Sequence, residues 1–413
     1  MKILINNKFY LTYVLTLLMP LFFLIDGNIY YFDNKIDLPS EKNIYNVPLP
    51  ISIISSAILF LYIIYKKKIN SFNHTILKIL FFSTFLTFFC LLISGNFNFN
   101  KVLKLVQFLL PWVGLIIALN LQSNKNIFKV IYYFLFFFIG LQITITFFYK
   151  KLIIISDIFF FTVYQNIQYI SSIFALLTII TSINLFKNNE LKIFFLNFIT
   201  LIYLILTYSF TAIFIHLFFI ITSIIYLIYN FENKKNYIIS YLAIFLSILI
   251  ISLSYFSLKN YNLDKNLFII KNKKNYYLNF EKFKDLRELK VPENVKLRII
   301  IWKKYYEKIK NKKIILLFGD KNQNLDDKYS SAHNLIIDII YSLGIFLVIP
   351  YLVILVKIIQ TLIICNDKKV FFSIFFVTFI FVLENCFKLS AKQPYPGLIT
   401  FFFIGYFLNK DEN

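Results

Sequence analysis

The chain has 413 residues, of which 59% are hydrophobic, 20% aromatic and only 15% charged. A soluble domain contains about 45–50% apolar and about 25% charged residues, so this surplus of apolar side chains excludes an ordinary soluble fold, whereas lipid accommodates it. The 43 basic residues against 21 acidic ones give a net charge of +22. In a membrane protein such cations anchor cytoplasmic loops beside membrane lipids, so we expect no nucleic-acid partner.

The apolar segments of the chain are long enough for helices that cross a membrane. A spanning helix needs about 20 largely apolar residues, and the pattern predicts about twelve of them. They lie at 9–25, 48–65, 76–94, 102–119, 127–148, 161–186, 191–208, 211–229, 237–257, 335–363, 370–386 and 394–408. No small-x-small cleavage site follows the first, so we predict an uncleaved helix there. The expected fold is an all-α polytopic membrane protein.

Lysines in the short loops predict how these helices are oriented. They are more numerous in the loops that are cytoplasmic if the N-terminus lies inside, as the bias of basic residues in membrane proteins requires. Both termini are then expected in the cytoplasm. Residues 1–257 would hold helices 1–9 and residues 334–413 helices 10–12, with one large external loop at 258–333 between helices 9 and 10.

The sequence contains no pattern typical of a disulfide framework or a metal site. Cys90, Cys365 and Cys386 lie within or beside apolar segments, and none lies in the long loop. That loop has an acidic pair at Asp326–Asp327, whose adjacent side chains would lie on different faces of a helix. We therefore expect no metal and no cofactor.

The long loop is strongly basic. Residues 259–332 hold 17 lysines and two arginines against nine acidic residues, a net charge of +10. The two arginines, Arg287 and Arg298, are the only ones in the chain. Arginine presents a planar fork that grips phosphate oxygens, whereas lysine acts as a point charge. The loop therefore predicts an anionic, phosphate-bearing partner; the alternative is a solvated loop with two arginines by chance.

An amphipathic helix is expected near the end of this loop. Pro292 is typical of a first helical turn. Apolar side chains then recur at i, i+3, i+4 and i+7, which predicts one stripe made of Trp302, Tyr305, Tyr306 and Ile309. Arg298 lies four residues before Trp302 and so belongs to the stripe, while lysines 303, 304, 308 and 310 lie mostly elsewhere. The stripe points towards the membrane or a site, or packs on the transmembrane bundle.

His333 ends the loop, directly before the tenth apolar segment. Histidine titrates near neutral pH and can take a proton from a hydroxyl group. Asn334 follows it, and Asp338 falls at the edge of the next helix, where a carboxylate is costly. His216 lies inside an apolar segment and is expected to be a buried bundle residue.

An ordered set of motifs occupies about fifty residues. Arg298 is followed by Trp302, by the apolar turn Ile315–Gly319, by Ala332–Leu335 with its His-Asn pair, and by Leu343–Ile345 with a glycine. This set resembles the bacterial O-antigen ligase and polymerase superfamily. Its members carry an arginine–tryptophan helix, an apolar turn that ends in glycine, and a His-Asn or His-Ser element before an apolar helix and a glycine. Elsewhere the resemblance is one of architecture.

The resemblance implies a membrane glycosyltransferase whose donor is a glycan on undecaprenyl diphosphate. A polymerase joins repeat units and a ligase passes the glycan to lipid A-core, in both cases on the periplasmic side of the bacterial inner membrane. Arg298 would contact the diphosphate and His333 would be the catalytic histidine. Trp302, Asn334 and Asp338 would support them. Arg287 matches no motif and is added as a diphosphate ligand from the charge of the loop.

One position departs from the family pattern, and two other functions stay open. Many members have a Ser-Arg pair between two mid-chain helices, where this chain has Ser209-Phe210; Arg287, Lys150 or Lys151 would have to compensate. A flippase or transporter of lipid-linked oligosaccharides would show repeated halves and charges along the bundle. A scaffold protein would tolerate substitution of His333.

Overall fold

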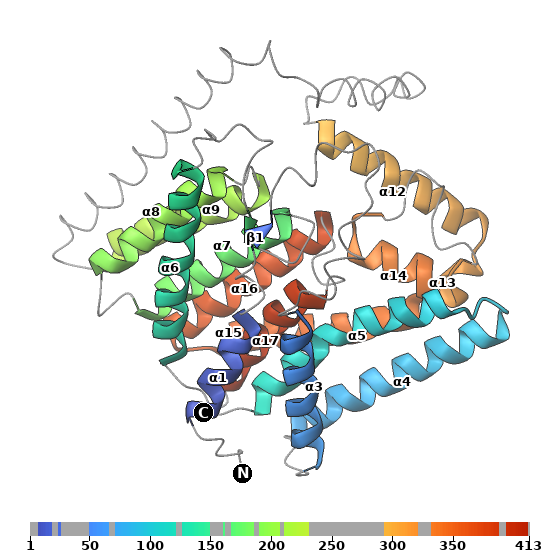
Figure 1. The fold of residues 1–413 in the computed structure, drawn as a ribbon. Coiled ribbons are helices and arrows are strands. Elements are labelled where there is room, and N and C mark those ends of the chain that lie inside the picture. The colour runs from blue at the N-terminus through green and yellow to red at the C-terminus, as the bar shows by residue number, and fades with distance from the viewer. Residues whose placement is uncertain are drawn as a thin grey trace.

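The computed structural model describes the chain in twelve pieces. They are residues 7–18, 24–25, 49–65, 71–120, 126–148, 160–161, 167–185, 190–206, 210–230, 293–320, 332–387 and 394–411. These residues are helical apart from short turns and one antiparallel pair of two-residue strands, β1 (Leu24–Ile25) and β2 (Phe160–Phe161) (Figure 1). The fold is therefore all-α in its architecture.

The first half of the described chain follows the predicted helical segments closely. Its helices are α1 (Asn7–Leu18), α3 (Leu49–Tyr65), α4 (Ser71–Ile93), α5 (Phe99–Asn120), α6 (Asn126–Phe148), α7 (Ile167–Leu185), α8 (Glu190–Leu206) and α9 (Phe210–Asn230). The helices of the second half are α12 (Glu293–Asn311), α13 (Ile315–Phe318), α14 (Leu335–Leu343), the 3-10 helix η6 (Ile345–Leu347), α15 (Val348–Ile364), α16 (Lys368–Phe387) and α17 (Pro394–Asp411).

Several helices have the length and composition of membrane spans. Within the described residues, four are long and apolar enough: His74–Ile93, Phe99–Asn120, Ile345–Ile364 and Lys368–Cys386. Six shorter apolar helices accompany them, in α3, α6, α7, α8, α9 and α17. The architecture is compatible with a helical protein embedded in a membrane.

The structure corrects three details of the predicted segments. The first helix ends at Leu18, and Leu24–Ile25 form a strand instead of completing a span to residue 25. The sixth segment begins with strand β2, and its helix starts only at Ile167. The expected tenth span at 335–363 is broken at Gly344, so that the long apolar helix begins at Ile345. The ninth predicted span, 237–257, lies outside the described residues.

Helices α5 and α17 pack closely at the centre of the bundle, and two glycines allow it. A Cβ on Gly114 of α5 would collide with the Leu398 carbonyl of α17, and a Cβ on Gly405 of α17 would lie 2.6 Å from the Leu115 carbonyl oxygen of α5. Small residues let helix backbones approach each other in membrane proteins. The two helices are therefore held together by backbone proximity that larger side chains would prevent.

Aromatic side chains extend this contact to α15. Trp112 of α5 makes edge-to-face contacts with Tyr351 at 5.1 Å and Phe401 at 5.0 Å between ring centroids. The Tyr351 hydroxyl donates to the Phe108 carbonyl oxygen at 3.2 Å. Because lipid removes most of the hydrophobic driving force between helices, close packing and such interhelical bonds hold a membrane bundle together.

Helix α7 runs through the bundle and is buried from Ser171 to Ser182. Two polar pairs join it to α8: Thr178 and Thr200 share a hydrogen bond of 3.0 Å, and the Asn197 side-chain amide donates to Ser182 Oγ at 2.9 Å. His216 of α9 is fully buried, and its Nε2 lies 3.3 Å from the Asn197 carbonyl oxygen. The expectation that His216 is a buried bundle residue is confirmed.

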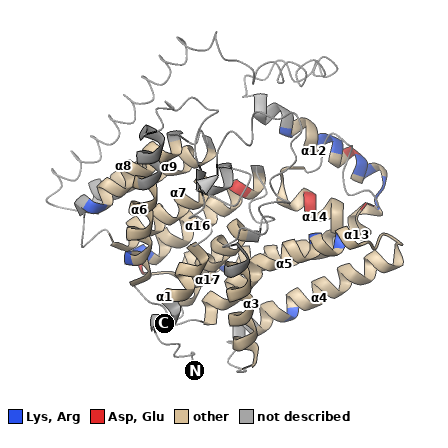
Figure 2. Cartoon of the chain, in the orientation of Figure 1, with Lys and Arg blue, Asp and Glu red and all other residues tan. Residues whose placement is uncertain are grey.

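Charged side chains are most frequent along α12. Figure 2 shows mostly basic residues along this helix, whereas charged residues are scattered over the described helices of the bundle. In Figure 1, α12 lies beside α13 and α14, near one end of α4 and α5. We call α12, α13, α14 and the turns that join α13 and α14 to their neighbours the cap.

Candidate functional site

Helix α12 carries an apolar face towards the rest of the cap. Ile301 and Tyr305 are 2% and 1% exposed, and Trp302 is half-buried beside them. Tyr306 is 65% exposed, so its place in the predicted stripe is wrong. A turn of 3.6 residues puts the centre of the face on Ile301 and Tyr305 and leaves position 306 on its outer edge. The helix packs on the rest of the cap, whereas the sequence left open the membrane or a site and the transmembrane bundle.

Two aromatic residues of α12 fasten the helix to the segment around His333. The Trp302 indole N–H donates to the Ala332 carbonyl oxygen at 2.8 Å. One turn further along, the Tyr305 ring meets the Tyr341 ring edge-to-face at 4.7 Å between centroids. The arginine–tryptophan helix and the His-Asn element are therefore in direct contact, although 30 residues separate Trp302 from Ala332.

His333 has a left-handed backbone with φ of 52°, which is uncommon for a residue with a side chain. Its preceding residue is held on both sides: Ala332 N–H donates to Asp338 Oδ1 at 2.6 Å, and the Ala332 carbonyl accepts the Trp302 bond. Ala332 is fully buried, while the His333 side chain is exposed. Strained backbone of this kind persists where surrounding contacts impose it, and it is frequent at functional sites.

The residues after His333 start helix α14. Asn334 is its N-cap, and the Asn334 side-chain oxygen accepts the Ile337 N–H at 3.2 Å. Asp338 lies in the first turn and is 6% exposed. Its carboxylate is therefore a structural acceptor for Ala332 in this arrangement, and it supports His333 through the backbone.

Two glycines fix the close approach of α13 and α14. Gly319 has φ of 67° and Gly344 has φ of 91°, both in the region that favours glycine. A Cβ on Gly319 would lie 2.6 Å from the Ser342 carbonyl oxygen, and a Cβ on Gly344 would collide with the Leu317 carbonyl. Gly319 after α13 thus packs against the backbone of Ser342, and Gly344 after α14 packs against the backbone of Leu317.

A polar network joins the cap to α5. Asp320 accepts a hydrogen bond from the Tyr341 hydroxyl at 2.8 Å and forms an ion pair of 3.1 Å with Lys308. Lys308 also donates to the Tyr341 hydroxyl. Lys101, fully buried at the start of α5, donates to the Asp320 carbonyl oxygen at 2.6 Å. Asn96 adds a longer contact of 3.4 Å to the Gly319 carbonyl oxygen.

Sequence reasoning missed this network. Lys308 was expected away from the apolar stripe, yet it lies three residues after Tyr305 and reaches the same side as Asp320. The spacing of three residues between Tyr305 and Lys308 was the sequence signal that could have placed Lys308 on this side of α12. For Lys101 and Asp320 no local signal exists, because their contact spans 219 residues of sequence.

The expected site residues are brought together in part. Trp302, His333, Asn334 and Asp338 meet around Ala332. Arg298 is half-buried on α12, one turn before Trp302. Arg287 lies outside the described residues, as do Lys150 and Lys151, and Phe210 is the first residue of α9.

The arrangement presents an exposed imidazole on a rigid backbone, next to a helix with a cationic surface. Such an imidazole can accept a proton from a hydroxyl group, and fixed cations can stabilise developing negative charge.

In comparisons with known proteins, no protein-family model and no curated protein matches this chain.

Proposed function

We propose that this chain is a membrane glycosyltransferase of the O-antigen ligase or polymerase type. It moves a glycan from undecaprenyl diphosphate to a lipid A-core or glycan acceptor. The observation that carries the proposal is the left-handed His333, held by the Trp302 and Asp338 bonds to Ala332. The helix that carries Arg298 and Trp302 meets the His-Asn element at the neighbouring Ala332, which supports the interpretation of these two motifs as a site.

The proposed topology has about twelve membrane-spanning helices in the bacterial inner membrane, both termini in the cytoplasm and the cap in the periplasm. One observation supports placing the cap there. Asn96 and Lys101, at the junction of α4 and α5, bond to Gly319 and Asp320 in the long loop, and the proposed topology places both segments on the outside. The contact is therefore consistent with this topology.

In the proposed reaction, an acceptor hydroxyl oxygen attacks the anomeric carbon of the donor glycan. The bond from that carbon to the diphosphate oxygen breaks, and undecaprenyl diphosphate leaves with the electron pair. His333 takes the hydroxyl proton, and Arg298, with Arg287, stabilises the charge on the leaving group. Attack from the face opposite the leaving group inverts the anomeric centre. Because no metal takes part in these steps, an added chelator should leave activity unchanged.

The lipopolysaccharide banding pattern of a deletion strain tests this function. The strain is complemented with wild type, with His333→Ala, or with His74→Ala as a control at an exposed histidine of α4. Loss of every O-chain band, restored by wild type and by His74→Ala only, indicates a ligase. A surviving single-repeat band indicates a polymerase.

Full rescue by His333→Ala would contradict the catalytic assignment. A flippase or transporter without catalytic activity then becomes the better account. A second readout separates the two: a flippase defect leaves lipid-linked glycan on the cytoplasmic side, whereas a transferase defect leaves it accessible from the periplasm.

A further inference from the structure

Three exposed apolar side chains lie on and beside the short helix α13. Ile314, directly before the helix, is 63% exposed, and Leu316 and Leu317 are 37% and 45% exposed. Ile315, by contrast, is buried in the core of the cap. Single exposed apolar residues are ordinary, but three within four consecutive positions form a contiguous surface, and such surfaces mark contacts with a partner or a membrane.

A basic segment precedes this apolar surface. Residues 308–319 contain four lysines and no acidic residue. One of the four, Lys308, is paired with Asp320 inside the cap. The other three are Lys310, Lys312 and Lys313, and all are exposed. Figure 2 shows the basic residues continuing from the end of α12 into the turn before α13. Exposed cations therefore lie next to exposed apolar side chains.

The surface on α13 continues the apolar outer face of the bundle. Helix α13 packs against α4 and against η6, and Asn96, just after α4, bonds to the Gly319 carbonyl oxygen at the end of α13. The α4 helix and the Ile345–Ile364 helix that begins with η6 are both long and apolar enough to cross a membrane, and less than half of each is buried. In a bilayer their exposed faces lie against lipid, so α13 lies at the end of a lipid-facing surface.

We propose that residues 310–317, which we call the anchor, bind anionic phospholipid headgroups at the membrane surface. The apolar side chains of the anchor enter the boundary of the acyl chains, while its long lysine side chains reach the level of the phosphates. Basic residues beside a membrane are attracted to anionic lipids more than to zwitterionic ones. Because the Leu317 carbonyl packs on Gly344, the anchor holds the cap against the membrane.

Fluorescence quenching by brominated lipids tests whether the anchor enters the bilayer. The full-length chain, without its three cysteines, carries a fluorescent label on Leu317→Cys and is reconstituted in phosphatidylcholine vesicles. Lipids brominated in the acyl chains quench only a label that reaches them. We expect the label at 317 to lose most of its fluorescence and a label on Lys303→Cys, an exposed position of α12, to lose little. Equal quenching at the two positions would overturn the proposal.

The headgroup of the brominated lipid tests the charge. Brominated phosphatidylglycerol is compared with brominated phosphatidylcholine in the same vesicles. We expect phosphatidylglycerol to quench the label at 317 at an about fivefold lower mole fraction, because each lysine near a membrane attracts anionic lipid. Equal quenching by the two lipids would show an apolar contact without selection of anionic headgroups and would overturn the anionic-lipid site.

Lysine variants locate this preference. Lys310→Gln, Lys312→Gln and Lys313→Gln together should abolish the preference for phosphatidylglycerol and keep the quenching itself. The matched control removes the same charge from three exposed lysines outside the cap, on α6, α8 and α16. Its substitutions are Lys129→Gln, Lys192→Gln and Lys368→Gln. The control should keep the preference, and its survival in the first variant would contradict a lipid site at the anchor.

Thermal unfolding tests the same site in a chain that keeps its cysteines. The unfolding temperature is compared between vesicles of phosphatidylcholine and vesicles that also contain phosphatidylglycerol, at one ionic strength. We expect phosphatidylglycerol to raise it by about 2–4 °C in wild type, because a ligand of the folded state stabilises it, and not in the variant with three glutamines in the anchor. An equal rise in that variant would contradict the proposal.

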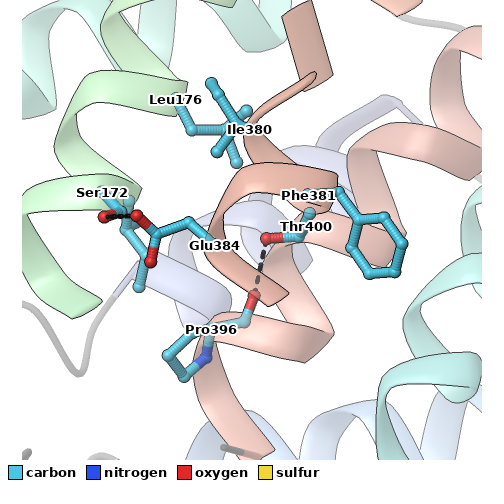
Figure 3. A pocket seen from close by; sticks show the side chains of 8 residues that line it. Ser172, Leu176, Ile380, Phe381, Glu384, Pro396 and Thr400 are labelled. Atoms are coloured by element: carbon cyan, nitrogen blue, oxygen red, sulfur yellow. Dashed lines mark hydrogen bonds between the residues drawn. The ribbon is translucent and has the colours of Figure 1, made fainter. Parts of the chain in front are cut away.

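Thr400→Val is the control for a weakened bundle in this measurement. Thr400 is buried in α17, where its hydroxyl donates to the Pro396 carbonyl oxygen at 2.8 Å (Figure 3). This variant changes the interior of the bundle and leaves the anchor intact, so it should keep the full response to phosphatidylglycerol. Loss of the response in Thr400→Val would show that the lipid acts on the bundle as a whole and would overturn the assignment to the anchor.

Discussion

The bundle and the cap are stabilised in different ways. In the bundle, aromatic rings such as Trp112 and Phe401 pack against each other, and polar pairs such as Thr178 and Thr200 join neighbouring helices. In the cap, a few polar bonds converge on one peptide, Ala332, and on one carboxylate, Asp320. A bundle with many small contacts tolerates the loss of one. A cap that depends on a few bonds should lose its geometry when one of them is removed.

The largest effect on folding is expected at Gly344. Gly344→Ala places a Cβ against the Leu317 backbone and strains a positive φ, which should cost about 3 kcal/mol or more of unfolding free energy. Gly95→Ala is the matched control, because Gly95 has φ of 64° but no atom within 4 Å of the place where a Cβ would stand; it should cost about 1 kcal/mol. Equal losses in thermal unfolding would show that the packing of α13 on α14 does not matter.

A smaller loss is expected at Asp338. Asp338→Ala leaves the buried Ala332 N–H without its acceptor, at a cost of about 1–3 kcal/mol. Asp338→Asn keeps a side-chain oxygen and should retain most of the stability and the activity. If Asp338→Asn is as inactive as Asp338→Ala while both fold, the charge of the Asp338 carboxylate takes part in the chemistry. Its hydrogen bond to Ala332 would then not be enough to explain what Asp338 does.

One hydrogen bond can be removed from each region for a direct comparison. Trp302→Phe deletes the bond to Ala332 in the cap, and Tyr351→Phe deletes the bond to Phe108 in the bundle. Each should cost about 1 kcal/mol. Only Trp302→Phe should also lower glycan transfer, since it alone frees the peptide before His333. Equal rates of glycan transfer by the two variants would show that the cap bond matters no more for activity than the bundle bond.

The smallest effect on stability is expected at His333 itself. His333→Gly fits the left-handed backbone without strain and should raise the unfolding free energy by about 0.5–1 kcal/mol. It should nonetheless abolish transfer, because the imidazole is gone. A gain in stability together with a loss of activity would show that the strain at this position is retained for function.

The sequence predicted the helices well where the signal is local. Apolar runs at 49–65, 126–148 and 368–387 are visible without knowledge of the rest of the fold, and α12 followed from its periodic stripe. The break at Gly344 was missed because it depends on the Leu317 carbonyl, which only the folded chain brings close. A continuous apolar run gives no sign of such a contact.

The sequence predicted the residues of the candidate site but not the hydrogen bonds that join them. His333, Asn334, Asp338 and Trp302 were singled out from residue type and order. The Asp338 bond to Ala332 and the Asp320 network with Lys101 depend on tertiary contacts that no spacing encodes. The stripe on α12 was displaced towards Tyr306 because its aromatic ring was counted as buried, whereas burial is decided by what the helix packs against.

The most direct test of the central claim is glycan transfer by the purified protein. Undecaprenyl-diphosphate-linked glycan and an acceptor are supplied without added metal, and release of undecaprenyl diphosphate is measured for wild type, His333→Ala and His74→Ala. We expect His333→Ala to be at least about 100-fold slower than wild type, and His74→Ala to match wild type. Transfer at the wild-type rate by His333→Ala, with an unchanged unfolding temperature, would contradict the assignment of His333 as the proton acceptor.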